Sequence, residues 1–193
     1  MNGYKIKNQN ALHFITPTVV GWIDVFTRNE YKRIIIESLR YCCEHKGLHL
    51  YAYVIMSNHM HMIVKAEDGY ELSNILRDFK RHTSRSILRL VIQSKKESRK
   101  KWLLSSFKYH AKFNKNNKTY QLWKRDNHPV ELLSPKWISI RINYIHKNPV
   151  VAGIVDKPEN YIYSSARNYL NLIDVKIHVE IIEFGSMEGY VFM

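Results

Sequence analysis

Residues 48–65 (LHLYAYVIMSNHMHMIVK) constrain the fold more than any other part of the chain. Two runs of apolar and β-branched residues flank the dipeptide Ser57-Asn58, which suits a tight connection, so the segment predicts a β-hairpin. Successive side chains of a strand point to opposite faces. His59 and His61 therefore share one face of the second predicted strand, and the apolar residues next to them share the other.

The remaining elements follow from apolar residues at helical spacing, from β-branched runs and from capping residues. In chain order we predict a strand and its continuation over 11–26, a helix from the capping box Thr27-x-x-Glu30 to Gly47, the hairpin over 48–65, a helix over 71–93, a strand or extended turn over 119–133, a helix from Ser134-Pro135 to Asn148-Pro149, and a short helix over 161–170. Sequence-adjacent antiparallel strands with helices on one face make an α+β antiparallel sheet protein of the ferredoxin-like kind.

No internal repeat or low-complexity linker divides the chain. We expect one domain over 1–170, with a basic arm over 94–118, followed by a tail over 171–193 that adds a late strand near 175–184. No stretch is apolar and long enough to span a bilayer, and the first ten residues lack the pattern of a signal peptide. Adjacent cysteines rarely form a disulfide with each other, so Cys42 and Cys43 favour a reducing cytoplasm.

Basic side chains are concentrated in two neighbouring stretches. The chain has 30 Lys and Arg against 17 Asp and Glu, a net charge of +13, and such a protein usually meets a polyanion such as nucleic acid. On the helix over 71–93, arginines recur every four residues, a spacing that suits a phosphate backbone and equally a solvated helix face. The candidate DNA contacts of both stretches are Arg77, Lys80, Arg81, Arg85, Arg89, Lys95, Lys96, Arg99, Lys100 and Lys101.

We interpret the segment 94–118 as a partly mobile arm with a short ordered piece around 102–107. Its interleaved aromatic residues could stack on unpaired bases. Trp102 and Phe107 could equally attach the arm to the core.

Two pairs of residues can carry chemistry. His59 and His61 stand at i and i+2 on a strand, close enough to share a metal ion, but in a chain with 10 histidines such a pair also arises by chance. Tyr144 and Asn148 stand at i and i+4 and share one helix face, which Arg141 extends as a further candidate DNA contact. A lone helical tyrosine more often packs than reacts, so neither pair alone decides the function.

Three segments together resemble motifs of the single-tyrosine HUH transposases, and the REP-associated and related insertion-sequence type is the most similar branch. They are 53–64 (YVIMSNHMHMIV), 143–155 (NYIHKNPVVAGIV) and 163–169 (YSSARNY), and they occur in the order of that family. The resemblance spans roughly residues 12–170. Ser57 stands where the family often has Pro, and the basic arm has no counterpart that we can match.

The resemblance implies a ferredoxin-like HUH endonuclease fold and an enzyme that cuts and rejoins single-stranded DNA, often next to a hairpin, through a 5′-phosphotyrosine intermediate. Tyr144 would be the nucleophile, and His59, His61 and the amide of Asn148 would bind Mg²⁺ or Mn²⁺. His146 points away from the Tyr144 face, so we expect it to be a surface histidine. Expected partners are single-stranded or hairpin DNA and no membrane, so we expect a cytoplasmic protein associated with the nucleoid. The family includes both monomers and homodimers. Two alternatives remain: a non-catalytic nucleic-acid-binding module, and a metal-dependent hydrolase in which the tyrosine only packs.

Overall fold

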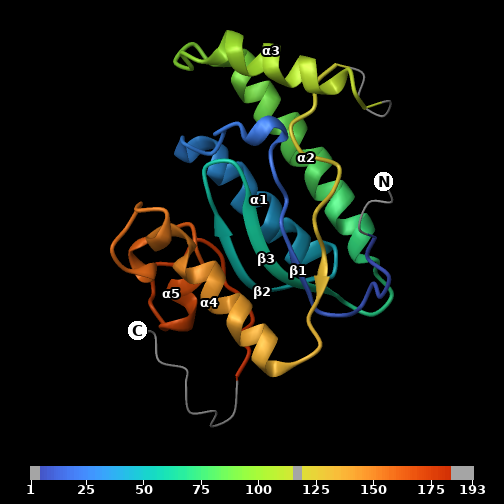
Figure 1. The fold of residues 1–193 in the computed structure, drawn as a ribbon, viewed down its shortest axis with the longest axis vertical. Helices are drawn as coiled ribbons and strands as arrows, with labels where there is room; N and C mark the ends of the chain where they lie inside the picture. The colour runs from blue at the N-terminus through green and yellow to red at the C-terminus, as the bar shows by residue number, and fades with distance from the viewer. Residues whose placement is uncertain (1–4, 115–118, 184–193) are drawn as a thin grey trace.

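A four-stranded antiparallel sheet occupies the centre of the computed structural model, which describes residues 5–114 and 119–183 (Figure 1). The strands are β1 (His13–Ile15), β2 (Leu48–Ile55), β3 (Met60–Ala66) and β4 (Val130–Glu131), in the spatial order β2-β3-β1-β4. The sequential pair β2 and β3 lies next to β1, and β4 closes the other edge. This arrangement confirms the α+β class and the ferredoxin-like topology.

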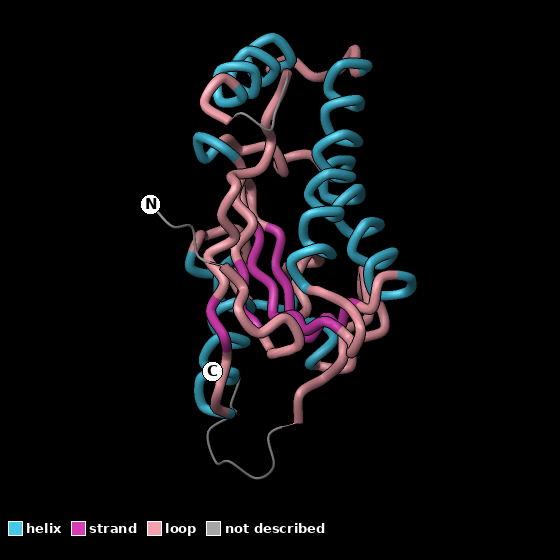
Figure 2. Tube along the Cα trace, turned by 90° about the vertical axis from the view of Figure 1, so that its right-hand side faces the viewer, coloured by secondary structure: helices cyan, strands magenta, loops and turns pink. Residues whose placement is uncertain are grey.

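Helices lie on both faces of the sheet (Figure 2). Long helices α1 and α2 cover one face, as predicted, whereas α4 lies across the other face, which the sequence left uncovered. A helix therefore covers the face that carries His61, and the exposed fraction of His61 is only 6%. The helices and 3₁₀ turns are η1 (Val20–Trp22), α1 (Asn29–His45), α2 (Leu72–Gln93), α3 (Lys100–Ala111), α4 (Pro135–Val151), η2 (Pro158–Asn160) and α5 (Ala166–Tyr169).

The predicted hairpin is confirmed. Four residues connect β2 to β3, and the backbone N–H of Met56 donates to the carbonyl of His59 at 2.9 Å across this turn. Gly47 ends the helix before the hairpin, at a φ of 63° that favours glycine. A Cβ atom at this position would also lie 2.5 Å from the ring of Tyr70, so both the backbone and the space require glycine.

Two predictions about the first third of the chain are wrong in part. The strand over 11–26 is limited to β1, because the following residues bond to the hairpin turn and to a later segment: Val19 N–H donates to Asn58 and Val20 N–H to Leu122. The capping box does not form. Its threonine, Thr27, instead accepts a hydrogen bond from the Arg99 guanidinium, and α1 starts at Asn29 with no side-chain cap.

The predicted mobile arm is largely a helix, α3. Phe107 is fully buried and attaches the helix to the core, while Trp102 is exposed and does not. The segment after it is extended, with β4 as its one short strand in the described residues. Residues 115–118 of the arm lie outside the described part of the chain.

Helix α4 starts as predicted and ends later. Ser134 caps it by accepting a hydrogen bond from Trp137 N–H, but the helix continues through Pro149 to Val151. Hydrogen bonds from Gly153 N–H to Val150 and from Ile154 N–H to Pro149 then close it in a Schellman motif. A proline this close to a helix end removes one N–H and does not stop the last turn.

The expected late strand is absent from residues 175–183, and residue 184 lies outside the described part. This tail still packs on the sheet edge, where Glu180 N–H donates to Leu50 and Ile177 is buried. In residues 5–114 and 119–183, no helix is long and apolar enough to cross a membrane.

Candidate active site

The two histidines of the hairpin lie side by side on the face that α4 covers. His61 belongs to β3, and His59 precedes that strand by one residue and forms a bridge with Thr18. Their ring centroids are 4.8 Å apart. The predicted pairing of these two rings on one face is therefore observed.

Each imidazole is oriented by a partner at Nδ1. His61 Nδ1 lies 2.9 Å from the hydroxyl of Thr16, and His59 Nδ1 lies 2.7 Å from the amide oxygen of Asn58. Phe14 also stacks on the His61 ring, with centroids 5.2 Å apart. Fixing Nδ1 in this way leaves Nε2 of both rings for a ligand, as in metal sites where a second group sets the ring orientation.

Both histidines are neutral at ordinary pH. Burial lowers the pKa of His61 to about 3, and the neighbouring His59 and Arg141 add to the shift because a second charge beside them is unfavourable. Burial also lowers the pKa of His59, although Asp24 opposes the shift. Neutral imidazole is the form that binds metal ions, so no proton has to leave before a cation enters.

Tyr144 faces the His pair from the opposing helix. Its hydroxyl lies 3.4 Å from His61 Nε2, and the two rings meet edge to face with centroids 5.1 Å apart. The residue is 45% exposed, so Tyr144 lies at the surface of the molecule. The structure thus brings together residues that are 83 positions apart in the sequence.

Arg141 lies one turn before Tyr144, with its guanidinium carbon 4.8 Å from the centre of the Phe14 ring. Its Nε–H has no hydrogen-bond partner among the described residues. A cation placed here can donate to a phosphate oxygen next to the tyrosine hydroxyl.

Asn148 follows Tyr144 by one turn, about 6 Å along the helix axis, and is half-buried. In residues 5–114 and 119–183, no three His, Cys, Asp or Glu side chains gather closely enough to hold a metal ion. A third protein ligand would therefore have to be of another kind, and the amide oxygen of Asn148 is such a donor. Two imidazoles and one amide suit a divalent cation with open positions for phosphate.

His146 is not the surface histidine that its spacing suggested. It is 1% exposed, its Nε2 lies 2.9 Å from the hydroxyl of Ser165, and burial lowers its pKa to about 3. Helical spacing did place it away from Tyr144, but the segment after α4 folds back and covers that side. The motif 163–169 provides this cover, because it also bonds to the edge of β2 through Tyr53 and Ile55.

The predicted DNA contacts fall into two groups. Arg77, Arg81 and Arg85 line a cleft of about 630 Å³ between α2 and residues 120–127. Others are used inside the protein. Lys80 donates to the carbonyls of Lys124 and Arg125 and to the Asn127 side chain, and burial lowers the pKa of Lys80 to about 8.

Some of the predicted DNA contacts in the basic arm also form hydrogen bonds within the protein. Arg99 bonds to the carboxylate of Glu97 and to the Asp24 carbonyl, and Lys100 bonds to the Ile92 carbonyl. These two residues therefore have less freedom to meet DNA. The exposed candidates outside the cleft are Arg89 on α2 and Lys95, Lys96 and Lys101 in the arm.

Comparisons with known proteins show the family and the fold of the chain. A family model described as transposase, IS200 like, matches residues 12–125, more than half of the chain. The chain belongs to the IS200-like transposase family. The matched residues include both histidines and end before Tyr144. The candidate role of Tyr144 therefore depends on its position in the structure and on the motif around it.

Solved structures extend the likeness over nearly the whole chain. The structure of a REP-associated tyrosine transposase bound to a REP hairpin has 16% sequence identity, covers 96% of each chain and gives a TM-score of 0.62. A structure from Deinococcus radiodurans R1, described as a proposed transposase, has 14% identity, covers 73% of this chain and 93% of that one, and has a TM-score of 0.41. The first comparison shows that the two proteins share a fold. A comparison with curated proteins found no match.

Sequence reasoning missed several residues around this candidate site. Thr16, which orients His61, lies in a short extended segment with no motif of its own. Trp22 meets the His59 ring edge to face, and Lys124 lies 4.3 Å above the Trp22 ring. The only sequence signal was the density of aromatic and basic residues in these segments, which does not show that they converge.

Proposed function

We propose that this member of the transposase family cuts and rejoins single-stranded DNA, with Tyr144 as the nucleophile. The observation that carries the proposal is the 3.4 Å separation between the Tyr144 hydroxyl and Nε2 of His61. A helix and a strand from distant parts of the chain bring a nucleophile and a metal-ligand pair together. A tyrosine that only packed would not need its hydroxyl at this point.

In the cutting step, the phenolic oxygen of Tyr144 attacks the phosphorus of a phosphodiester. The bond between phosphorus and the 3′ oxygen breaks, and the 5′ phosphate stays on the tyrosine. The phenol gives up its proton to solvent water, and the leaving 3′ oxygen takes up a proton in its place. In the rejoining step, a 3′ hydroxyl attacks the phosphotyrosine and Tyr144 leaves. Each step exchanges one phosphoester bond for another, so no ATP is required.

The residues around the tyrosine have distinct parts in this reaction. Tyrosine has a pKa near 10 and has to lose its proton to attack well. Because the pKa of His61 is about 3, it would accept this proton poorly and suits the role of metal ligand better than that of base. Arg141 would donate to a non-bridging oxygen and offset the charge that develops on it.

His59, His61 and Asn148 would hold Mg²⁺ or Mn²⁺, which neutralises charge on the phosphate oxygens and orients the phosphate for in-line displacement. The neutral imidazoles and their fixed Nδ1 atoms support this assignment. We propose single-stranded or hairpin DNA as the substrate. The net charge of +13 supports it, and the fold is shared with a transposase bound to a REP hairpin.

The test is covalent capture. Incubation with a labelled single-stranded oligonucleotide that carries a hairpin, with Mn²⁺ or Mg²⁺, should give a protein–DNA adduct that survives denaturing electrophoresis. Tyr144→Phe should abolish the adduct and keep the fold. Tyr41→Phe is the matched control, because Tyr41 is similarly exposed, at 53%, but lies on α1.

An adduct that persists in Tyr144→Phe would remove this residue as the nucleophile. Cleavage without any adduct would indicate a metal-dependent hydrolase. Binding with neither cleavage nor adduct under both metals would indicate a non-catalytic DNA-binding protein.

A further inference from the structure

Asn58 lies in the turn between β2 and β3, and its side-chain amide makes three hydrogen bonds. Its Nδ2 donates to the carbonyl of Trp22 at 3.2 Å and to the carboxylate of Asp24 at 3.0 Å. Its Oδ1 lies 2.7 Å from Nδ1 of His59. The amide therefore joins a carboxylate outside the candidate active site to one imidazole within it.

The two ends of this amide are not equivalent. The NH₂ group only donates hydrogen bonds, and the oxygen only accepts them. Both partners of Nδ2, the Asp24 carboxylate and the Trp22 carbonyl, are themselves acceptors. A flipped amide would place its oxygen against these two oxygens and leave both without a donor. Asp24 and Trp22 thus decide which end of the Asn58 amide faces His59.

The orientation of the amide in turn decides where His59 carries its hydrogen. Because Oδ1 of Asn58 can only accept, Nδ1 of His59 has to donate. A neutral imidazole has a single N–H, so a hydrogen on Nδ1 leaves the lone pair of Nε2 free. The other tautomer has its hydrogen on Nε2 and cannot bind a cation through that atom.

The backbone that carries Asp24 is held on both sides. The N–H groups of Val19 and Phe26 donate to the hairpin turn at 2.8 and 2.7 Å, so the chain is bonded to the turn before and after Asp24. The guanidinium of Arg99 also donates to the Asp24 carbonyl at 2.8 Å. The carboxylate therefore starts from a fixed point next to Asn58.

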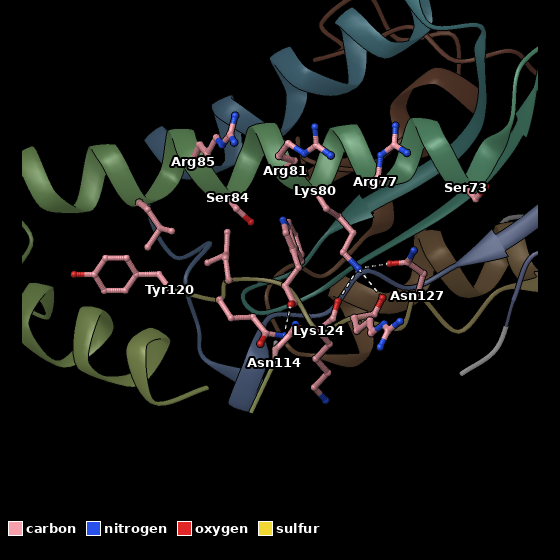
Figure 3. Close-up of a pocket in the computed structure, with 15 residues that line it drawn as sticks. Ser73, Arg77, Lys80, Arg81, Ser84, Arg85, Asn114, Tyr120, Lys124 and Asn127 are labelled. Carbon is pink, nitrogen blue, oxygen red and sulfur yellow. Dashed lines mark hydrogen bonds between the residues drawn. The ribbon is translucent and has the colours of Figure 1, made fainter. Parts of the chain in front are cut away.

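The second acceptor belongs to a residue with a strained backbone. Trp22 has a φ of 55°, a left-handed conformation that a bulky residue rarely adopts. Its ring meets the His59 ring edge to face, with centroids 5.8 Å apart. The ammonium group of Lys124, which also lines the cleft along α2 (Figure 3), lies 4.3 Å from the centre of the Trp22 ring. Such strain persists where surrounding contacts require it, often at functional sites.

The two histidines differ in this respect. The partner of His61 at Nδ1 is the hydroxyl of Thr16, which can either donate or accept. It orients the ring without deciding by itself which nitrogen carries the hydrogen. The partner of His59 can only accept in the orientation that Asp24 and Trp22 impose. Control of the tautomer is therefore a property of the His59 side of the pair.

We propose that Asp24 is a positioning residue that fixes the hydrogen of His59 on Nδ1 through the Asn58 amide. The inference rests on the proposed function for the role of His59 as a metal ligand. The tautomer itself exists in the metal-free protein. It can be measured there whether or not Tyr144 forms an adduct with DNA.

The experiment determines the tautomer of His59 by NMR. Two-bond ¹H–¹⁵N correlation spectra of the full chain, labelled in histidine and kept in EDTA, distinguish a nitrogen that carries a hydrogen from one with a free lone pair. The spectrum of His59→Gln identifies the His59 signals. We expect the hydrogen on Nδ1 alone in the wild type, and a mixture of both tautomers in Asp24→Ala, because its amide is free to flip.

The matched control is Asp68→Ala. Asp68 is exposed, as Asp24 is, but lies in the turn after β3. This variant removes the same charge and should keep the wild-type tautomer. Thermal unfolding checks that all variants are folded.

A rescue variant separates the proposed role from a merely structural one. In Asp24→Ala/Asn58→Asp, the ionised carboxylate at position 58 has no donor end, so no second residue is needed to orient it. The hydrogen should return to Nδ1 of His59 although Asp24 is absent. Loss of a structural contact at position 24 would not be repaired in this way.

Metal affinity gives a second readout. In calorimetric titration with Mn²⁺, Asp24→Ala should bind about 10–100-fold more weakly than the wild type, and the rescue variant should recover most of this loss. Salt screens a charge at the surface. A loss caused by the tautomer should therefore persist at high salt.

Three results would overturn the inference. They are a hydrogen that stays on Nδ1 alone in Asp24→Ala, a rescue variant that remains a mixture, and a loss of Mn²⁺ affinity that disappears at high salt. If the tautomer responds as expected but the wild type forms no adduct with DNA, the result counts against Tyr144 as the nucleophile and supports the role of Asp24.

Discussion

At the scale of single residues, the orientation of His61 depends on one hydroxyl. Thr16 holds Nδ1 at 2.9 Å, and this contact directs Nε2 toward Tyr144. Without it the ring can rotate, and the ligand atom would lose its fixed position. Partners of this kind typically contribute 10–100-fold to metal affinity or activity.

We therefore expect Thr16→Val, which keeps the shape and removes the hydroxyl, to weaken Mn²⁺ binding by about 10–100-fold in calorimetric titration. Adduct formation should fall in parallel. Thr83→Val is the control, because Thr83 is another buried hydroxyl and bonds to Phe79 and Trp123, away from the histidines. Unchanged Mn²⁺ affinity in Thr16→Val would show that the hydrogen bond does not orient a ligand.

The buried His146 makes the protein sensitive to acid. Its folded pKa is about 3, below the ordinary value of 6.5. Between these values the unfolded chain binds a proton that the folded chain does not, so stability falls as the pH falls. In the pH range between the two pKa values, each such group lowers the free energy of unfolding by up to roughly 1.4 kcal/mol for each pH unit of acidification. Above that range it has no effect.

His146→Gln should lower stability at pH 7, because the contact with Ser165 changes, and should make the acid loss shallower by roughly 1 kcal/mol per pH unit. Urea unfolding at pH 7, 6, 5 and 4 measures both effects. A variant whose stability falls as steeply as that of the wild type would mean that His146 is protonated in the folded protein.

At the scale of elements, the corner between α2 and α3 is built on a buried carboxylate. Glu97 forms ion pairs with Arg28 at 3.0 Å and Arg99 at 3.2 Å, and it accepts a hydrogen bond from Tyr31. These contacts join the corner to the start of α1. They fix the point from which α3 starts, while buried Phe107 attaches the helix itself to the core.

Glu97→Gln should destabilise the protein by about 2–3 kcal/mol. The loss is smaller than for breaking a fully buried ion pair, because both arginines are about a third exposed. Asp78→Asn is the control. It removes an exposed pair with Arg77 and should change the free energy of unfolding by less than about 1 kcal/mol. Equal effects in chemical denaturation would show that the corner is not held by the charge.

The elements predicted correctly from local patterns are those that neighbouring residues in the sequence are enough to form. The hairpin and α2 follow from alternation and helical spacing, and both appear within a few residues of their predicted ends. The capping box at Thr27 and the short β1 failed because distant partners decide them: Arg99 binds the threonine, and Asn58 and Leu122 bind the chain after β1. The arm was predicted to be partly mobile because of its high charge, although Phe107 was already a candidate attachment; α3 buries this residue together with Leu103, which the sequence reasoning did not single out.

The same distinction applies to the site. Strand geometry predicted that His59 and His61 share a face, and helical spacing predicted the face of Tyr144 and Arg141. No local pattern shows that α4 crosses the sheet on the histidine side. That meeting depends on tertiary packing, and so do Thr16 and Trp22, which carry no motif.

At the scale of the whole molecule, the basic regions are spread along its length. Figure 1 shows α3 at the opposite end from α4, with α2 and the sheet between them. The cleft on α2 thus lies between the exposed lysines of the arm and the tyrosine. A DNA strand that contacted the arm, the cleft and the tyrosine would follow the long axis of the protein.

The whole molecule also bears on whether subunits share the site. One chain places the Tyr144 hydroxyl 3.4 Å from Nε2 of His61, so the proposed site would need no second copy for this contact. A shared site would place the tyrosine of each chain near the histidines of its partner. Mixed inactive variants distinguish the two arrangements, whether or not the protein forms a homodimer.

We expect Tyr144→Phe and His59→Ala/His61→Ala to be inactive singly and to remain inactive when they are mixed and refolded together. The measurement is adduct yield in the Mn²⁺ assay, with refolded wild type as the control for recovery. If subunits exchanged tyrosines, a mixed pair would contain one site with an intact tyrosine and intact histidines. Random pairing makes half of the pairs mixed, and each mixed pair has one working site of two. Up to a quarter of the wild-type sites would therefore return. Recovery at that level would show that α4 swaps between copies, and its absence would mean that α4 acts on the sheet of its own chain.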